Sequence, residues 1–130
     1  MASQYLNLAY KIIDKALIFA FIHKESNFNR SAESNKGAIG LMQLMPSTAR
    51  FISKNKKIRK GNTSILKDPL INIEMGQNYI KYLLNLDIVN NNVIYMAAAY
   101  NAGPGNLKKW LDEINHNDDT LLFMESIPSR

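Results

Sequence analysis

The sequence has 130 residues, of which 46% are hydrophobic and 21% are charged, as expected for a single soluble globular domain over 1–130. It contains no cysteine, which excludes a disulfide framework and thiolate metal sites. The net charge of +5 favours a polyanionic partner, such as a nucleic acid, an anionic membrane face or another negatively charged polymer.

The first predicted element is an amphipathic helix from about Leu6 to Lys24, which Glu25 closes. Its apolar run, Ala16 to Ile22, is too short to span a bilayer, and no signal-peptide cleavage site follows it. The sequence therefore predicts no membrane span. The helix face is marked by apolar residues at helical spacing, namely Ile12, Ile13, Ala16, Leu17 and Ala20.

A polar loop is predicted next, followed by a second irregular stretch from Gly37 to Pro46. This stretch is unusual because Leu, Met, Gln, Leu and Met follow its second glycine, whereas surface loops are usually polar. We expect it either to enter the core or to form the floor of a groove. Leu41 and Leu44 are assigned mainly to the core.

A short helix is predicted after this loop, with Ser47 as its cap. The densest basic run, Lys54 to Lys60, is interpreted as a solvated helix end and loop. A turn then leads to a third helix that Asn72 caps and that extends to about Asp87. Gly76 lies inside this helix at a cost of about 1 kcal/mol relative to alanine, which indicates close helix packing.

Three further helices are predicted, and no stretch alternates as a β-strand does. They run from about Asn91 to Tyr100, from Gly105 to Ile114, and through the segment DDTLLFMESIP with Asp118 or Asp119 as its cap. The prediction is an all-α, compact helical domain.

Most motifs for metal, cofactor or nucleic-acid chemistry are missing. His23 and Glu25 match the first half of a zinc deaminase signature, but the cysteines of its second half do not exist. There is no H-E-x-x-H, EF-hand loop or P-loop, and nucleic-acid binding is supported by charge alone. We expect no metal, no cofactor and no nucleic-acid partner.

Glu25 is the remaining candidate for chemistry. Phe21 and Ile22, one turn earlier, give it apolar neighbours, and burial would raise the pKa of a carboxyl toward the range of a general acid. An exposed glutamate in the last turn of a helix is the simpler interpretation of this residue taken alone.

Several blocks of the sequence resemble the bacterial lytic transglycosylases of the soluble, goose-lysozyme-like type. They occur in the family's order and spacing and cover about Ile12 to Pro128. The matching blocks are Glu25, Ser26 and Phe28; Ser34; GAIGLMQLMPSTA (Gly37 to Ala49); DP..NIE.G..Y...L (Asp68 to Leu83); AAYNAGPGN...W (Ala98 to Trp110); and ESIP (Glu125 to Pro128).

The resemblance implies a lysozyme-like fold with a glycan-binding groove and one catalytic acid/base, Glu25. It also implies a periplasmic or cell-envelope location, peptidoglycan as the substrate, a monomer, and docking to larger envelope or secretion machinery. Because the family continues past this point with another helix, the domain is expected to be truncated at its C-terminus. The substrate-binding residues that the resemblance implies are Ser34, Gly40, Met42, Gln43, Met45, Tyr100, Asn101 and Glu125.

The activity implied is cleavage of the β-1,4 bond between N-acetylmuramic acid and N-acetylglucosamine, with a 1,6-anhydromuramoyl product. Glycosidases ordinarily use two carboxylates, whereas only Glu25 has a convincing context here. Two alternatives remain open: a lysozyme-like muramidase in which water attacks, and a non-catalytic peptidoglycan-binding module of an envelope machine.

Overall fold

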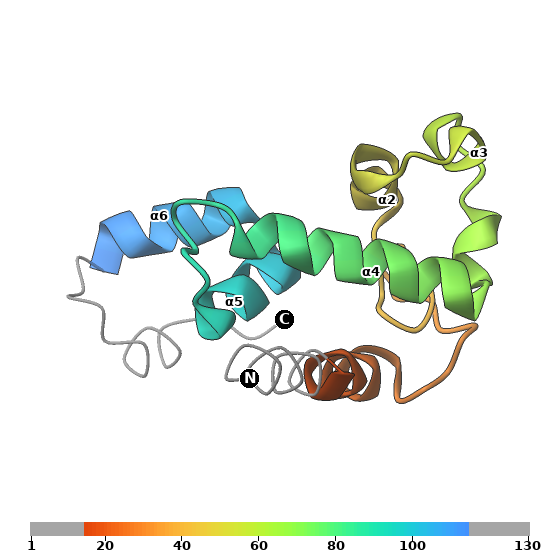
Figure 1. Cartoon of the computed structure of the whole chain (residues 1–130), viewed down its shortest axis with the longest axis horizontal. Coiled ribbons are helices and arrows are strands. Elements are labelled where there is room, and N and C mark those ends of the chain that lie inside the picture. Colours follow the sequence, from red (N-terminus) through yellow and green to blue (C-terminus); the bar gives the residue numbers. More distant parts are fainter. Residues whose placement is uncertain (1–14, 115–130) are drawn as a thin grey trace, which may run out of the picture. The chain divides into compact units, whose positions relative to one another are not determined.

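A computed structural model of the chain describes residues 15–114 (Figure 1). These residues form helices joined by turns, and their β pairing is limited to isolated bridges at Glu33↔Ile39 and Ile39↔Leu44, so the all-α prediction is confirmed. After a helix described over 15–26, the elements are α2 (Pro46–Ile52), α3 (Lys56–Arg59), the 3-10 helix η1 (Ser64–Lys67), α4 (Pro69–Leu84), α5 (Val93–Ala102) and α6 (Pro104–Ile114).

The chain separates into two compact units, Met1–Asn78 and Tyr79–Arg130, with the division inside α4. Each unit has its own buried apolar residues. Those of the first unit include Phe21, Ile22, Ala38, Ile39, Leu41, Met42, Leu44, Ala49, Ile58, Leu66 and Met75. Those of the second include Tyr79, Ile80, Leu83, Val89, Tyr95, Met96, Ala98, Ala99, Tyr100 and Leu107.

The predicted caps of two helices are wrong for the same reason, a proline at the first helical position. Pro46 starts α2 and Met45 is its N-cap, without a side-chain hydrogen bond, so Ser47 does not cap it. Pro69 starts α4, and the carboxylate of Asp68 accepts hydrogen bonds from the backbone N–H groups of Leu70 (2.9 Å) and Ile71 (3.2 Å). Proline suits the first helical position, because an N–H there has no partner within the helix and the φ of proline is already helical, so the residue before it takes the cap position. Asn72 therefore lies inside α4.

The basic run after α2 forms a short helix of its own. The Asn55 side chain caps α3 by accepting a hydrogen bond from the backbone N–H of Lys57 (2.9 Å). Ile58 is fully buried, while the four basic residues around it are exposed. The prediction of solvated charges is thus confirmed. The sequence did not predict the helical turn of α3, in which Ile58 packs into the core.

In the second unit, α4 ends at Leu84 rather than near Asp87, and Asn92 caps α5 through its side-chain oxygen. Gly103, at φ +90°, separates α5 from α6, which Pro104 begins. The fourth and fifth predicted helices are therefore confirmed to within two residues. The predicted start of the first helix at Leu6 and the predicted helix at 118–128 lie outside the described residues. Among the described residues, no helix combines the length and the apolar character needed to cross a bilayer.

Gly76 marks a close approach between α4 and the loop before α2, so the close packing predicted from its position inside a helix exists, but the partner is a loop side chain. A Cβ atom built on Gly76 would meet the Met42 side chain, including its Cβ at 3.1 Å. Met42 is itself 0% exposed, so it has no open space into which to move. The Met42 side chain therefore fills the space that any side chain at position 76 would need.

We expect Gly76→Ala to lower the free energy of unfolding by about 1–3 kcal/mol, because the added methyl overpacks a filled site. Chemical denaturation monitored by circular dichroism measures this. Gly105→Ala in α6 is the matched control: its Cβ would meet nothing within 4 Å, so the helix propensity of alanine should stabilise by up to about 1 kcal/mol. Equal stability of the Gly76→Ala variant and the parent chain would contradict the close packing.

Candidate active site

Glu25 lies in the last turn of the N-terminal helix, which extends through Ser26, two residues beyond the predicted end. Phe21 and Ile22, one turn earlier, are buried with exposures of 9% and 4%, and Glu25 itself is half-buried. The Ser26 hydroxyl donates a hydrogen bond to the carbonyl of Ile22 (3.1 Å). The carboxylate is thus carried by a helix end whose preceding turn is apolar, as the sequence predicted.

The chain leaves this helix through two consecutive non-glycine residues in the left-handed region, Asn27 (φ 49°) and Phe28 (φ 63°). Asparagine tolerates this conformation, whereas a bulky residue such as phenylalanine adopts it at a steric cost. Such strain is concentrated at functional sites, where surrounding contacts enforce it. Here it turns the backbone sharply within three residues of Glu25.

Backbone hydrogen bonds close two tight turns within the Gly37–Pro46 stretch and just before it. Ile39 and Leu44 exchange both backbone hydrogen bonds (2.9 and 3.0 Å), which closes a tight turn over 40–43. In a second turn, the backbone N–H of Ser34 donates to the carbonyl of Ala38 (2.9 Å), and the Ser34 hydroxyl accepts from the N–H of Ala38 (3.0 Å). The N–H of Gly40 donates to the carbonyl of Ala32 (2.8 Å).

The amide of Asn72 holds the 40–43 turn from inside α4. Its oxygen accepts from the backbone N–H of Met42 (2.8 Å), and its nitrogen donates to the carbonyls of Ile39 (2.9 Å) and Leu66 (2.8 Å). Asn72 is 0% exposed. Gly40, at φ +82°, has no room for a Cβ, which would collide with this amide and lie 2.7 Å from the Leu66 carbonyl oxygen.

The sequence did not indicate Asn72 as a site residue, because its position near a helix start predicts an N-cap. The signal that could have identified it is its spacing from Gly76, four residues later on the same face of α4. Both residues meet the same loop: Gly76 accommodates the Met42 side chain, and Asn72 binds the Met42 backbone.

The structure assigns different places to the residues of this loop. Leu41 and Leu44 are buried, as predicted, and Met42 belongs wholly to the core. Gln43, at φ 49°, is half-buried, and its Nε2 donates to the carbonyls of Ala32 (3.1 Å) and Gly40 (2.9 Å). Met45 is 38% exposed. Of the two methionines proposed to bind substrate, only Met45 presents surface to a ligand.

Glu33, the acidic residue nearest to Glu25 in the sequence, is exposed and paired with a lysine. It lies in the exposed loop before Ser34, and its side chain forms an ion pair with Lys67 (3.8 Å) in which both partners are about half exposed. In the part of the chain that the structure describes, no group of three or more His, Cys, Asp or Glu side chains could hold a metal ion.

The second unit places Tyr100 and Asn101 in the last turn of α5. Tyr100 is buried, and its ring centroid lies 5.4 Å from that of Tyr79 on α4. Tyr79 in turn stacks on Tyr82, with centroids 6.2 Å apart. These contacts fix the Tyr100 ring by packing, and burial, followed by the charge of Tyr82, raises the pKa of Tyr79. Asn101 is half-buried, and Glu125 lies outside the described residues.

The model of the family described as Transglycosylase SLT domain matches residues 4–123, so the chain belongs to this family. It is 39% identical over 119 residues to the soluble lytic murein transglycosylase of Escherichia coli K12, covering 91% of this chain and 18% of that protein. It is 36% identical to the membrane-bound lytic murein transglycosylase C of Haemophilus influenzae PittGG, covering 94% of this chain and 37% of that protein.

Solved structures of lytic transglycosylases share the fold. An inactive Glu-to-Gln mutant of Slt from Pseudomonas aeruginosa matches with a TM-score of 0.73 at 37% identity, over 87% of this chain and 18% of that one. A complex of the 70-kDa soluble lytic transglycosylase with bulgecin A matches with a TM-score of 0.73 at 36% identity, with the same coverage. The lysozyme-like helical fold is thereby confirmed, and this chain spans less than a fifth of these proteins' length.

We expect Asn72→Ala to lower the free energy of unfolding by about 3 kcal/mol or more, because it leaves buried backbone groups without partners. Hydrogen exchange gives a local readout: the Met42 amide should lose protection more than other amides of the first unit. Gln77→Ala, at an exposed position of α4, should change the free energy of unfolding by less than about 0.5 kcal/mol. Unchanged protection at Met42 would contradict the role of Asn72.

Tyr79 should make the stability of the chain depend on pH in the alkaline range. The raised pKa means that the native state keeps this proton when the unfolded chain, whose tyrosines titrate near 10.0, releases it. The stabilisation is complete below about pH 10 and is lost as the pH rises through the native pKa. Unfolding measured between about pH 9 and pH 11 should therefore lose less stability in Tyr79→Phe than in the parent chain. An equal loss of stability in Tyr79→Phe and in the parent chain over this pH range would contradict the prediction.

Proposed function

We propose that this chain is the catalytic domain of a lytic transglycosylase that cleaves peptidoglycan at the β-1,4 bond between N-acetylmuramic acid and N-acetylglucosamine. The observation that carries the proposal is the position of Glu25: half-buried, at the end of an apolar helix face, next to a strained turn, in a chain of the SLT family. Relatives named lytic murein transglycosylase support it, as does the inactive Glu-to-Gln mutant of the similar Slt from Pseudomonas aeruginosa.

The proposed reaction needs one carboxyl group. Protonated Glu25 donates its proton to the bridging oxygen, the bond from that oxygen to C1 of N-acetylmuramic acid breaks, and N-acetylglucosamine leaves with the new hydroxyl. The C6 hydroxyl of the same muramoyl residue then attacks C1, and its proton passes to the Glu25 carboxylate. A 1,6-anhydro ring closes, Glu25 regains its proton, and no water is consumed. The ion pair of Glu33 with Lys67 is consistent with a single working carboxylate.

Gln43 is proposed to bind the glycan through its amide oxygen. Both hydrogens of its Nε2 are used by the carbonyls of Ala32 and Gly40, so the oxygen is the group that it can offer to a ligand N–H or O–H. Ser34, Gly40 and Met45 belong to the same first unit. We retain them as substrate contacts, together with Tyr100, Asn101 and Glu125, whereas Met42 supports the turn from the core.

The proposal also covers the cellular location, the oligomeric state and the partners of the chain. A substrate in the cell wall requires a periplasmic or cell-envelope location, and relatives named as soluble and as membrane-bound murein transglycosylases fit this. The net charge of +5 suits an anionic wall. We propose that the chain acts as a single monomeric domain, without metal or cofactor, and that a larger envelope or secretion assembly positions it.

Digestion of purified cell-wall sacculi tests the function. Muropeptides one water lighter than the reducing forms should be released, and Glu25→Gln should lower their rate of release by about 100-fold or more, because general acid catalysis is lost. Mass spectrometry of the products measures both. Glu33→Gln is the matched control and should retain activity within about twofold, since an exposed ion pair contributes little.

Other outcomes of the digestion would indicate a different function. Reducing-end products that depend on Glu25 would identify a lysozyme-like muramidase. Binding to sacculi without any product, in the parent chain and in Glu25→Gln alike, would identify a non-catalytic binding module.

A further inference from the structure

The positive charge of the chain is concentrated in one stretch of the first unit. Residues 34–67 contain eight of the sixteen basic residues and none of the eleven acidic ones, so this stretch carries a formal charge of +8 and the rest of the chain −3. Five of the eight lie at the end of α2 and on α3 or its C-cap, and these two helices pack against each other. We call these five residues the basic cluster: Arg50, Lys56, Lys57, Arg59 and Lys60.

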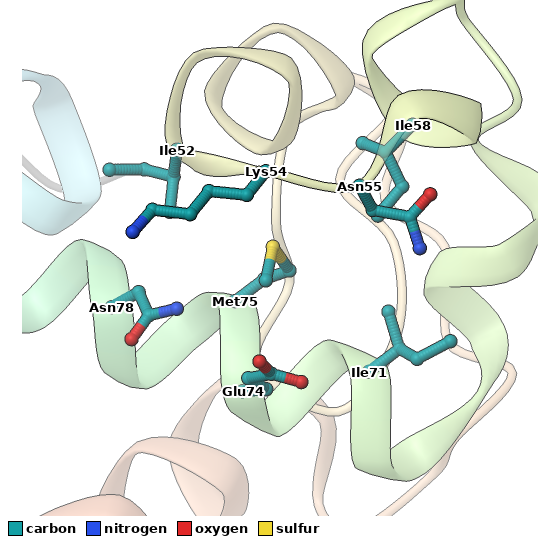
Figure 2. Close-up of a pocket in the computed structure, with 8 residues that line it drawn as sticks. All are labelled: Ile52, Lys54, Asn55, Ile58, Ile71, Glu74, Met75 and Asn78. Carbon is teal, nitrogen blue, oxygen red and sulfur yellow. The ribbon is translucent and has the colours of Figure 1, made fainter.

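The direction in which the cluster faces is set by Ile58. This residue is 0% exposed, and with Asn55 it lines a pocket of about 470 Å³ between the α2–α3 connection and the first part of α4 (Figure 2). None of the five basic side chains lines that pocket, and all five are exposed. Because α3 is a single turn, turning Ile58 toward α4 leaves the basic residues on the outer side. Figure 1 shows α2 and α3 together on one side of α4.

The charges of the cluster repel one another. Lys56 and Lys60 are four residues apart and Lys57 and Lys60 are three apart, and like charges at these spacings destabilise a helical turn. Among the described residues none of the five forms an ion pair, whereas Lys67, later in the same stretch, pairs with Glu33. A surface with this self-repulsion and no acidic residue in its own stretch suits a polyanion, which would relieve the repulsion.

The shape of the cluster and an exposed ring favour a lipid surface over a nucleic acid. Single-stranded nucleic acids are bound in basic grooves with several stacking rings, whereas this cluster lies on the outside of a helical turn. A helix of four residues is also too short to lie along the major groove of DNA. Phe51, next to Arg50 on α2, is 65% exposed. Basic residues combined with an exposed aromatic ring are typical of segments that lie in the headgroup region of a membrane.

We propose that the basic cluster docks the chain onto a membrane surface rich in anionic phospholipids, with its cations on the lipid phosphates and the Phe51 ring among the headgroups. The choice of a lipid surface rests on the proposed function, because the wall that a lytic transglycosylase cleaves lies next to a membrane. Docking holds the enzyme beside its substrate and raises its local concentration there. The contact is electrostatic, so it weakens as the salt concentration rises.

Co-sedimentation of the whole chain with lipid vesicles tests this without any reaction. In about 0.1 M salt, vesicles that contain phosphatidylglycerol should bind the chain, and vesicles of phosphatidylcholine alone should not. Lys56→Gln combined with Lys57→Gln should weaken binding by about 25-fold, since each basic side chain at an anionic leaflet contributes about 5-fold. Lys108→Gln combined with Lys109→Gln is the matched control: it removes two exposed lysines of α6 and should weaken binding by less than about 2-fold.

Phe51→Ser distinguishes a lipid surface from a soluble polyanion. This change removes the ring but no charge. It should therefore weaken vesicle binding by about 10-fold, the effect of keeping about half of a phenylalanine side chain in water, and should leave the binding of inorganic polyphosphate unchanged. Equal vesicle binding by Phe51→Ser and the parent chain would overturn the assignment to a lipid surface.

Three other results would also overturn the proposal. Absence of binding to the anionic vesicles would exclude docking, and equal weakening by the two pairs of lysine substitutions would indicate diffuse attraction to the net charge. Tighter binding of a short DNA duplex than of vesicles, lost on substitution of Lys56 and Lys57, would assign the cluster to a nucleic acid.

Digestion of lipid-free sacculi separates this inference from the proposed function. Glu25-dependent anhydro products from a chain that does not bind anionic vesicles would leave the function standing and refute docking. Vesicle binding that depends on Lys56 and Lys57, in a chain that releases no anhydro product, would refute the function and support docking. Slower digestion of lipid-free sacculi by the variant at Lys56 and Lys57, with its vesicle binding unchanged, would assign the cluster to the wall polymer and overturn the proposal.

Discussion

The buried amide of Asn72 is the interaction on which the first unit depends. It joins α4 to the Met42 N–H and to the carbonyls of Ile39 and Leu66, so one side chain fixes three backbone segments. Backbone polar groups that are buried without a partner are costly, and this amide supplies partners both to the 39–42 turn and to the short helix η1. In the low dielectric of the interior, the fully satisfied amide also specifies one geometry for the turn.

The two glycines of this region follow from the same interaction. Gly40 leaves room for the amide of Asn72, and Gly76, one turn further along α4, leaves room for the Met42 side chain. A turn held in this way by its backbone can direct its side chains independently: Met42 enters the core, whereas Gln43 and Met45 remain accessible. The apolar composition of the loop is thus explained mainly by burial.

The proposed chemistry requires that the Glu25 carboxyl be held in place, as the amide of Asn72 holds the turn. A single carboxyl that acts first as acid and then as base must be held by its surroundings, since the proposed reaction gives it both roles. The buried Phe21 and Ile22 fix the last turn of its helix, and the left-handed Asn27 and Phe28 direct the chain away from it.

Periodicity and turn chemistry in the sequence determined the all-α class, the order of the main helices, the apolar neighbours of Glu25 and the close packing at Gly76. Local patterns failed at Ser47 and Asn72, because a polar residue near a helix start looks like a cap whether or not a proline has already fixed that start. Only the tertiary structure showed that Asn72 serves a loop some thirty residues away and that Met42 fills the space at Gly76. Partners so distant in the chain leave no period in the sequence, since their pairing is set by how α4 and the loop pack.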